Sequence, residues 1–220
     1  MFESITVIGA GGRAGSAISA RLRERGVELR AESGELVLLC VPDRAIAEVA
    51  GALEPGPWVA HVSGATPLAA LDPHERRFSV HPLQTLVAWR GPEQLDGAYA
   101  AVTAETDEAR RRGFWLAETL GLQSFELADA RRTLYHAGAV IASNYLATLY
   151  RSASALADEA GAPPEALVPL MIRTIENGFE LTGPISRGDW STVDAHLEAL
   201  HERHPELEPM YRALAEATRT

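Results

Sequence analysis

The chain begins with a short apolar segment that runs straight into a glycine-rich turn. Residues 5–8 are Ile-Thr-Val-Ile, residues 9–15 are Gly-Ala-Gly-Gly-Arg-Ala-Gly, and an alanine- and leucine-rich stretch follows over residues 16–25. β-Branched residues favour a strand, glycines permit a tight turn, and alanine and leucine favour a helix. Such a turn lets the backbone approach a pyrophosphate, whose charge the helix N-terminus attracts. This order predicts a dinucleotide-binding site at residues 9–15.

The spacing of the turn permits two alignments with the dinucleotide fingerprint. In one, Gly9, Gly11 and Ala14 form the alanine version of the pattern, and the last glycine comes one residue late. In the other, residues 12–15 form the working end of the turn and one residue is inserted before them. A glycine-rich turn without a ligand is the alternative to both. The expected cofactor contacts in the turn are Gly9, Gly11, Gly12, Arg13, Ala14 and Gly15.

Strand-like and helix-like segments alternate over the first half of the chain. Strands are expected at residues 5–8, 27–31, 36–41, 58–62, 78–80, 99–103 and 124–127, and helices at 16–25, 44–53 and 106–120. This alternation predicts a Rossmann-type α/β domain with a mostly parallel sheet over residues 1–128. Ligands of such sheets bind at the carboxyl ends of the strands, where the strand order reverses.

The second half has a different character and predicts an all-helical domain over residues 129–220. One long helix is expected from 130 to 160, ended by Gly161, and further helices at 165–179, 192–203 and 206–217. One face of the long helix carries a stripe at helical spacing, which predicts a packing surface. The stripe consists of Leu134, Gly138, Ile141, Tyr145, Leu149, Ser152 and Leu156.

The residues that would contact the adenosine half of a dinucleotide follow the second strand. Only four residues, 32–35, separate that strand from the third, which leaves no room for a helix. An acidic residue at this place suits a free ribose hydroxyl, whereas arginine suits a 2′-phosphate. Both occur here, and we expect contacts from Arg30 and Ser33, with NADP favoured and NAD left open. Val41 and Pro42, after the third strand, are expected to contact the cofactor as well.

Two strand ends carry polar side chains that suit a catalytic site. Ser63-Gly64 follows the fourth strand, and His81-Pro82 follows the fifth. In a parallel sheet Ser63 and His81 would face the same crevice as the glycine turn. A strand-ending turn with incidental polar residues is the alternative.

The long helix has a second face that combines hydrogen-bonding groups with small residues, as the lining of a cleft would. His136, Ser143, Asn144 and Arg151 fall within an arc of about 100°. A structural histidine is the alternative for His136. Farther on, Arg187 lies in a polar turn, where it would clamp a substrate carboxylate or pair with Asp189 to hold the turn.

Composition narrows the possible partners. The net charge of −10 argues against nucleic acid as a main partner, and no apolar run approaches the length of a membrane span. Because the first strand follows Met1 almost directly, we expect no signal peptide and a cytoplasmic protein.

The single cysteine, Cys40, is expected to be a buried thiol, with no metal site. The chain contains no lysine, which excludes lysine-dependent mechanisms.

These motifs resemble a family of bacterial Rossmann-like proteins with a C-terminal domain of unknown function 2520, within the 6-phosphogluconate-dehydrogenase-like reductases. Besides the glycine turn, the matching segments are residues 41–43, 61–64, 81–85, 136–144 and 181–189. The resemblance implies an NAD(P)-dependent oxidoreductase, and some members are similar to an alternative type of ketopantoate reductase in pantothenate biosynthesis. Related reductases bury such long helices between subunits, which implies a homodimer through the helical domain.

The resemblance also implies roles for residues. Better-known relatives carry Lys-x-x-x-Asn on the long helix; if Asn144 is that asparagine, Val140 stands where the lysine would be. A protonated histidine, His136 or His81, would therefore donate the proton during reduction of a small 2-oxo acid. Asn144 and Ser63 would orient the carbonyl, and Arg187 and Ser143 would contact the substrate. The alternatives are a non-catalytic dinucleotide-binding module and a dehydrogenase of the prephenate type.

Overall fold

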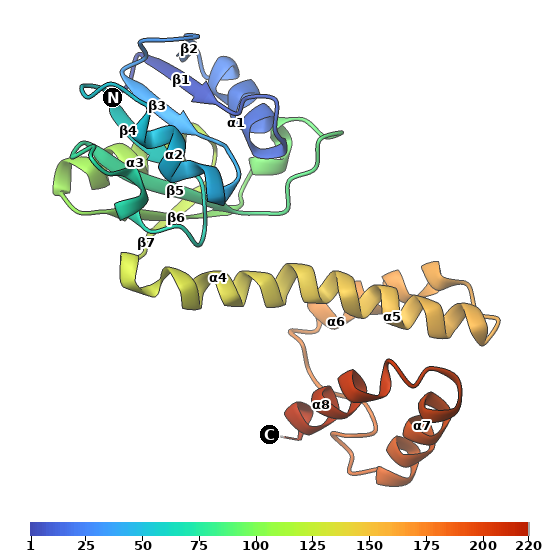
Figure 1. Ribbon diagram of the computed structural model, residues 1–220. Coiled ribbons are helices and arrows are strands. Elements are labelled where there is room, and N and C mark those ends of the chain that lie inside the picture. The colour runs from blue at the N-terminus through green and yellow to red at the C-terminus, as the bar shows by residue number, and fades with distance from the viewer. Residues whose placement is uncertain (220) are drawn as a thin grey trace. The chain divides into compact units, whose positions relative to one another are not determined.

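The protein consists of two compact units, Met1–Ser143 and Asn144–Thr220, in a computed structural model that describes residues 1–219 (Figure 1). The first unit is an α/β domain and the second is helical. The expected boundary at 128/129 marks the point where strands give way to helices, and as a domain boundary it stays a prediction. The compact units divide later because the start of the long helix packs against the sheet.

A seven-stranded sheet forms the centre of the α/β unit. Its order is β2-β1-β3-β4-β5-β6-β7, and all neighbouring strands are parallel except the antiparallel pair β5 and β6. The mostly parallel Rossmann-type sheet expected from the sequence is thus confirmed. The strands are β1 Ser4–Ile8, β2 Glu28–Leu29, β3 Leu36–Leu39, β4 Trp58–His61, β5 Arg77–Leu83, β6 Tyr99–Ala104 and β7 Gln123–Glu126.

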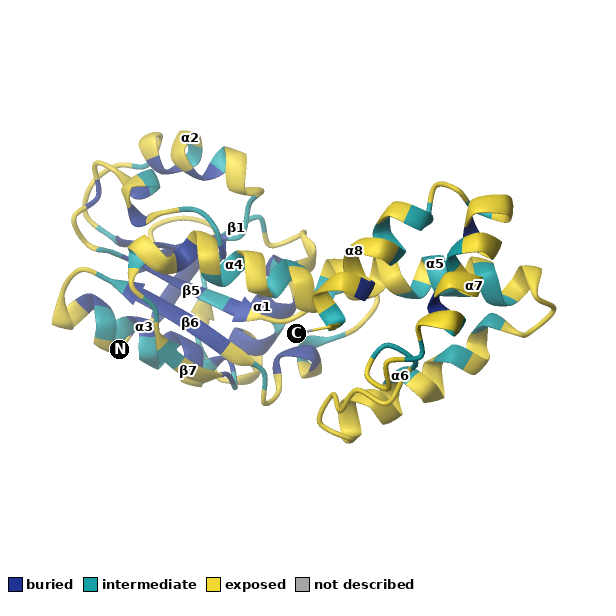
Figure 2. Cartoon of the chain, turned by 90° about the horizontal axis from the view of Figure 1, so that it is seen from below, coloured by how far each residue is buried: buried dark blue, intermediate teal, exposed yellow. Residues whose placement is uncertain are grey.

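Helices cover both faces of the sheet (Figure 2). Alternate residues of β3 point to opposite faces: Leu36 and Leu38 join a core with α1 (Arg13–Glu24) and α3 (Asp107–Thr119), whereas Val37 and Leu39 join a second core with α2 (Ile46–Gly51). Because both faces are covered, the central strands are continuously apolar. The sheet is therefore a rigid base for the loops at its strand ends.

The strand β2 is the shortest because the chain returns from it at once to β3. Gly34 lies tightly against β1: its amide donates a hydrogen bond to Thr6 Oγ1 at 3.1 Å, and a Cβ at this position would be 2.6 Å from the Thr6 nitrogen. The segment that follows β2 therefore passes in close contact with β1 on its way to β3 and leaves no room for a helix.

The long helix is interrupted by one π-helical segment, Ile141–Tyr145. Before it lies α4, Arg132–Val140, and after it lies α5, Leu146–Glu159. Gly161 ends the helix with a φ of 79°, as its position in the sequence predicts. The remaining helices are α6 Leu167–Glu176, α7 Trp190–Arg203 and α8 Glu208–Thr218.

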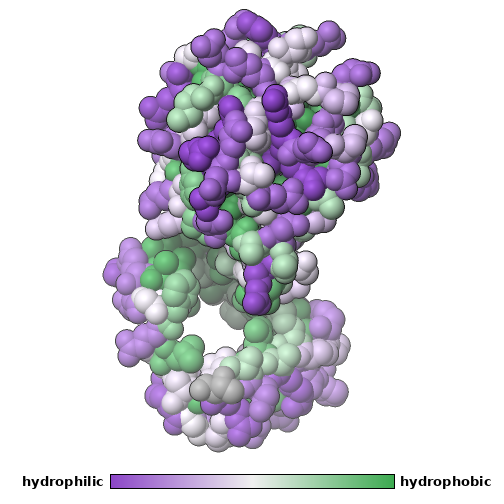
Figure 3. Space-filling view, turned by 90° about the vertical axis from the view of Figure 1, so that its left-hand side faces the viewer, coloured by the Kyte–Doolittle hydropathy of each residue, from purple (hydrophilic) through white to green (hydrophobic). Residues whose placement is uncertain are grey.

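Very few side chains of the helical unit are buried. Within its described residues only Val193, Leu200 and Ala215 are buried, whereas Tyr145 is 55% exposed and Ile172 is 50% exposed. Figure 3 shows green, apolar side chains gathered on the surface of this unit. Along the stripe of the long helix, Leu134, Ile141 and Tyr145 are exposed, whereas Ser152 and Leu156 are partly buried. The stripe is therefore only partly covered by other described residues of the chain, and its role as a packing surface stays a prediction. Across residues 1–219 no helix is long and apolar enough to cross a membrane.

Candidate functional site

The sheet has its topological switch point at β1, which lies between β2 and β3. At the carboxyl ends of the neighbouring strands is an open cavity of about 360 Å³. This is the place at which parallel α/β sheets bind ligands. Its lining includes six of the residues expected from the sequence, namely Gly12, Arg13, Ala14, Val41, Pro42 and His81.

The glycine turn is built for close contact between backbones. Gly9 has a φ of 90°, and a Cβ there would overlap the carbonyl of Cys40. A Cβ at Gly15 would overlap the carbonyl of Gly9, so this glycine allows α1 to pack on the turn. Gly12 is the N-cap of α1 and donates its amide to the Gly9 oxygen at 2.9 Å. Gly9, Gly12 and Gly15 thus occupy the three glycine positions of the dinucleotide fingerprint, which favours the alignment with one inserted residue.

The N-terminus of α1 is left open to an anion. Among the described residues no side chain caps it, and its first turn carries no acidic residue. A Cβ at Gly11 would meet nothing within 4 Å. Unpaired amides and the helix dipole favour negative charge at such an end. The turn therefore fits the pyrophosphate of a dinucleotide.

The residues expected at the adenosine end do not line this cavity. Arg30 is exposed and donates a hydrogen bond of 2.9 Å to Glu28, and this ion pair raises the pKa of Arg30. Ser33 is exposed, with a φ of 59°. Their contacts with a cofactor stay predictions.

His81 lies within β5, which continues to Leu83 and is thus longer than expected, and His136 lies beside it. Their ring centroids are 6.2 Å apart, and a Cβ at Gly64 would lie 2.7 Å from Cδ2 of His136 and 2.8 Å from Nε2 of His81. Gly64 is therefore the residue that leaves room for both imidazoles. The structure adds Tyr135, whose hydroxyl lies 2.8 Å from Nδ1 of His81. The sequence contained only a weak signal for it, which is its place next to His136 on the long helix.

His81 is neutral at pH 7. Burial is the main cause that lowers its pKa to about 4, and the neighbouring His136 and Arg132 lower it further. His61, at the end of β4, has its pKa lowered to about 3, mainly by burial and then by Arg132 and His81. A neutral His81 favours His136 as the proton donor, and the role of either histidine stays a prediction.

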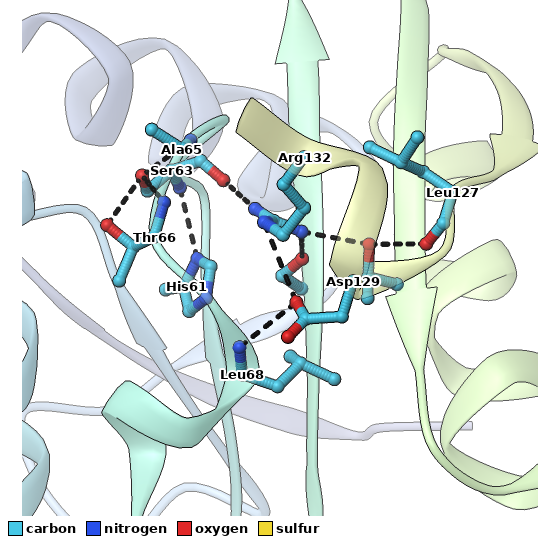
Figure 4. Close-up of polar contacts among 10 residues, drawn as sticks. His61, Ser63, Ala65, Thr66, Leu68, Leu127, Asp129 and Arg132 are labelled. Atoms are coloured by element: carbon cyan, nitrogen blue, oxygen red, sulfur yellow. Dashed lines mark hydrogen bonds and ion pairs between the residues drawn. The ribbon is translucent and has the colours of Figure 1, made fainter. Parts of the chain in front are cut away.

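A buried arginine, Arg132, connects the start of α4 with the turn after β4 and with neighbouring strands (Figure 4). Its side chain is 1% exposed, and it donates hydrogen bonds to Ser79 Oγ at 2.7 Å, to Thr103 Oγ1 at 2.8 Å and to the carbonyl oxygen of Ser63. Its Nε lies 3.8 Å from the carboxylate of Asp129. One guanidinium thus ties α4 to the ends of β4, β5 and β6. No local sequence pattern indicates this role, because an arginine in the first turn of a helix is usually exposed.

The hydroxyl of Ser63 forms hydrogen bonds within its own turn. Its hydroxyl oxygen accepts hydrogen bonds from the amides of Ala65 and Thr66 and lies 2.9 Å from the Thr66 hydroxyl. These contacts stabilise the turn after β4 and use the hydroxyl fully. The hydroxyl thus shapes the turn that contains Gly64, and a contact between Ser63 and a substrate carbonyl stays a prediction.

The other expected contacts are spread over both units. Ser143 shares a hydrogen bond of 3.0 Å with Thr85, in the loop after β5. Asn144 is exposed within the π-helical segment of the helical unit. Arg187 donates to the Thr182 carbonyl at 2.5 Å, while Asp189 caps α7. Arg187 thus holds its own turn through a backbone carbonyl, and its contact with substrate stays a prediction.

The sheet order, the glycine turn and the cavity at the switch point define a Rossmann-class α/β protein. A family model described as "Domain of unknown function (DUF2520)" matches residues 98–218, more than half of the chain. The chain belongs to this family. A comparison with curated proteins finds no match.

Solved structures resemble the chain over nearly its whole length. A Bacteroides fragilis protein described as a candidate NADP oxidoreductase has a TM-score of 0.82 at 22% identity and covers 99% of this chain and 98% of its own. A Thermotoga maritima protein has a TM-score of 0.73 at 21% identity, with coverage of 99% and 100%. A semialdehyde dehydrogenase NAD-binding protein from Cupriavidus necator, in complex with calcium and NAD, has a TM-score of 0.65 at 20% identity, with coverage of 97% and 99%. These similarities show the fold.

Proposed function

We propose that this protein is an NAD(P)-dependent oxidoreductase that reduces a small 2-oxo acid, with ketopantoate as the first substrate to test. The observation that carries the proposal is the cavity at the switch point. It brings the open N-terminus of α1 and the side chain of His81 to one place, so that an anion-binding end and a hydrogen-bonding imidazole line the same space.

The residues present fit a dinucleotide. Gly9, Gly12 and Gly15 allow the backbone of the turn to approach a ligand, and the amides at the start of α1 are free to bind a pyrophosphate. A bound nicotinamide in its reduced form would supply a hydride to the carbonyl carbon. Arg30 and Ser33 would favour the 2′-phosphate of NADP over NAD, since an arginine near this position suits that group.

His136, beside His81, would protonate the developing alkoxide. Asn144 would orient the carbonyl, Ser143 would contact the substrate, and Arg187 would bind the carboxylate through its guanidinium.

A second candidate is a dinucleotide-binding module without catalytic activity. It is favoured by Val140, which stands where related reductases have a lysine, and by the short segment after β2. A fluorescence titration with NADPH and NADH, followed by addition of ketopantoate, separates the two candidates. Binding followed by oxidation supports the reductase, binding alone supports the module, and the absence of binding contradicts both.

We also propose a homodimer that is formed through the helical unit. Ile172, Ile175 and Phe179 are each at least half exposed, and an apolar surface of this kind is unusual for a monomer in water. Because a twofold interface pairs the same surface of two copies, a second copy would cover these side chains symmetrically.

A further inference from the structure

Tyr135 and His81 form a contact that none of the functions above has used. The Tyr135 hydroxyl lies 2.8 Å from Nδ1 of His81, and the two rings meet edge to face, with centroids 5.5 Å apart and an interplanar angle of 86°. Both side chains are partly buried, and they come from α4 and β5. A short hydrogen bond between different elements fixes the orientation of the imidazole.

We propose that Tyr135 is a positioning residue that donates its hydroxyl hydrogen to Nδ1 of His81, so that the His81 proton lies on Nε2 and this nitrogen becomes a hydrogen-bond donor to the substrate oxygen. The hydrogen bond from His81 to the substrate rests on the proposed function, whereas the tautomer of His81 does not depend on that function.

The direction of the hydrogen bond follows from the groups around it. Burial raises the pKa of Tyr135 to about 12, so its hydroxyl keeps its hydrogen at neutral pH. Within residues 1–219 this hydroxyl has no other hydrogen-bond partner, and its other ring neighbour is Phe125, which offers no acceptor. A neutral imidazole has one bare nitrogen that accepts. Donation from Tyr135 to Nδ1 satisfies both groups, whereas the reverse arrangement leaves the hydroxyl hydrogen without a partner in the chain.

The space beside Nε2 of His81 is kept open by Gly64. A Cβ at Gly64 would lie 2.8 Å from both Nε2 and Cε1, and His81 is one of the residues that line the cavity at the switch point. The charged and titratable groups that act on His81 are His136, Arg132 and Asp43. Because the imidazole stays neutral, Nε2–H stabilises negative charge on an oxygen through a hydrogen bond, and no bond to hydrogen breaks at His81. The proton that completes the reduction would come from another group, such as His136.

Nuclear magnetic resonance of the protein with ¹⁵N-labelled histidine tests the tautomer without any ligand. The His81 signals are assigned by their loss in His81→Gln. At pH 7.5 we expect a protonated Nε2 and a bare, hydrogen-bonded Nδ1 in the wild type. Tyr135→Phe should move the Nδ1 resonance toward that of a bare nitrogen without a hydrogen bond. Tyr99→Phe, which removes an exposed hydroxyl on β6, should leave it unchanged. A protonated Nδ1 in the wild type overturns the proposal, as does an Nδ1 signal that does not respond to Tyr135→Phe.

Kinetics test the link to the substrate. With NADPH and ketopantoate, Tyr135→Phe should lower kcat by about tenfold, the size expected for one hydrogen bond, and leave the KM for NADPH unchanged. Tyr99→Phe should have wild-type kinetics. If the tautomer is as proposed and kcat does not change, His81 does not contact the reacting oxygen. If the wild type oxidises no NADPH, the proposed reductase function fails, and the tautomer result stands separately.

Discussion

Arg132, in the first turn of α4, donates a hydrogen bond of 2.7 Å to the hydroxyl of Ser79, two residues before His81 on β5. The same guanidinium binds the carbonyl of Ser63, next to Gly64. Arg132 thus fixes the chain next to His81 and next to Gly64, and Gly64 in turn leaves room for the rings of His81 and His136.

Replacing Arg132 should destabilise the α/β unit. Arg132→Gln leaves Ser79, Thr103 and the Ser63 carbonyl without their shared donor in a buried place, and each unsatisfied group costs on the order of 1–3 kcal/mol. We expect the free energy of unfolding to fall by about 3 kcal/mol in urea titrations. Arg131→Gln, which changes the exposed neighbouring arginine, should stay within about 0.5 kcal/mol of the wild type. Equal stability of the two variants would contradict the role of Arg132.

A methyl group at position 64 should disturb the two imidazoles. Gly64→Ala places a Cβ within 2.8 Å of both rings, so His81 and His136 must move, at a cost of about 1–3 kcal/mol. The histidine ring signals in a nuclear magnetic resonance spectrum should shift with the loss of stability. Gly51→Ala is the matched control, because a Cβ there meets nothing within 4 Å. Unchanged His81 and His136 signals in Gly64→Ala would show that the space is not restricted.

The stability of the protein should fall as the pH is lowered from 7 to 5. The folded-state pKa values of His81, about 4, and His61, about 3, lie below the ordinary value of 6.5. At a pH between the folded-state pKa and the ordinary value of 6.5, the unfolded state binds more protons than the folded state. The free energy of unfolding therefore decreases with falling pH, by up to about 1.4 kcal/mol per pH unit for each histidine. Urea titrations of wild type and His81→Gln should show a shallower pH dependence in the variant. Parallel curves would mean that His81 titrates normally in the folded protein.

Removal of His136 should affect chemistry more than cofactor binding. If His136 protonates the alkoxide, His136→Ala lowers kcat with ketopantoate by about 100-fold or more. The Kd for NADPH should stay close to that of the wild type, since the proposed pyrophosphate contacts lie on the glycine turn. Unchanged turnover would remove His136 from the mechanism.

The exposed apolar side chains of α6 should mediate association. Ile172 is 50% exposed, so Ile172→Glu places a charge on the proposed interface and should convert a dimer into monomers in analytical ultracentrifugation. Arg111→Glu introduces the same group on the exposed face of α3 and should leave the dimer intact. A wild-type monomer at micromolar concentration would contradict the homodimer.

Local sequence rules were sufficient to predict the fold. Each of the seven strands overlaps the range expected for it, and Gly161 ends the long helix because glycine tolerates a positive φ. The place of the glycine turn was also predictable, because the end of β1 determines where it lies, whereas β5 continues past His81 to Leu83.

The supporting residues could not be predicted in the same way. The role of Arg132 depends on Ser79 and Thr103, which are 53 and 29 residues away in sequence, and no local pattern connects them. Ser63 looked available for substrate, but its hydroxyl bonds to neighbouring amides, which depends on the conformation of the turn. The lowered pKa of His81 arises from burial and neighbouring charge, which are properties of the folded state.

We expect NADPH to bind at the glycine turn, and Gly11 offers a sharp test of this binding. A side chain at this position meets nothing within 4 Å, so Gly11→Asn and Gly11→Asp should both fold, and they differ mainly in charge. Fluorescence titration should show NADPH binding to the wild type and to Gly11→Asn, and at least tenfold weaker binding to Gly11→Asp, because the added carboxylate repels the pyrophosphate. Absence of binding to the wild type, or equal affinity of Gly11→Asp and Gly11→Asn, would contradict the account.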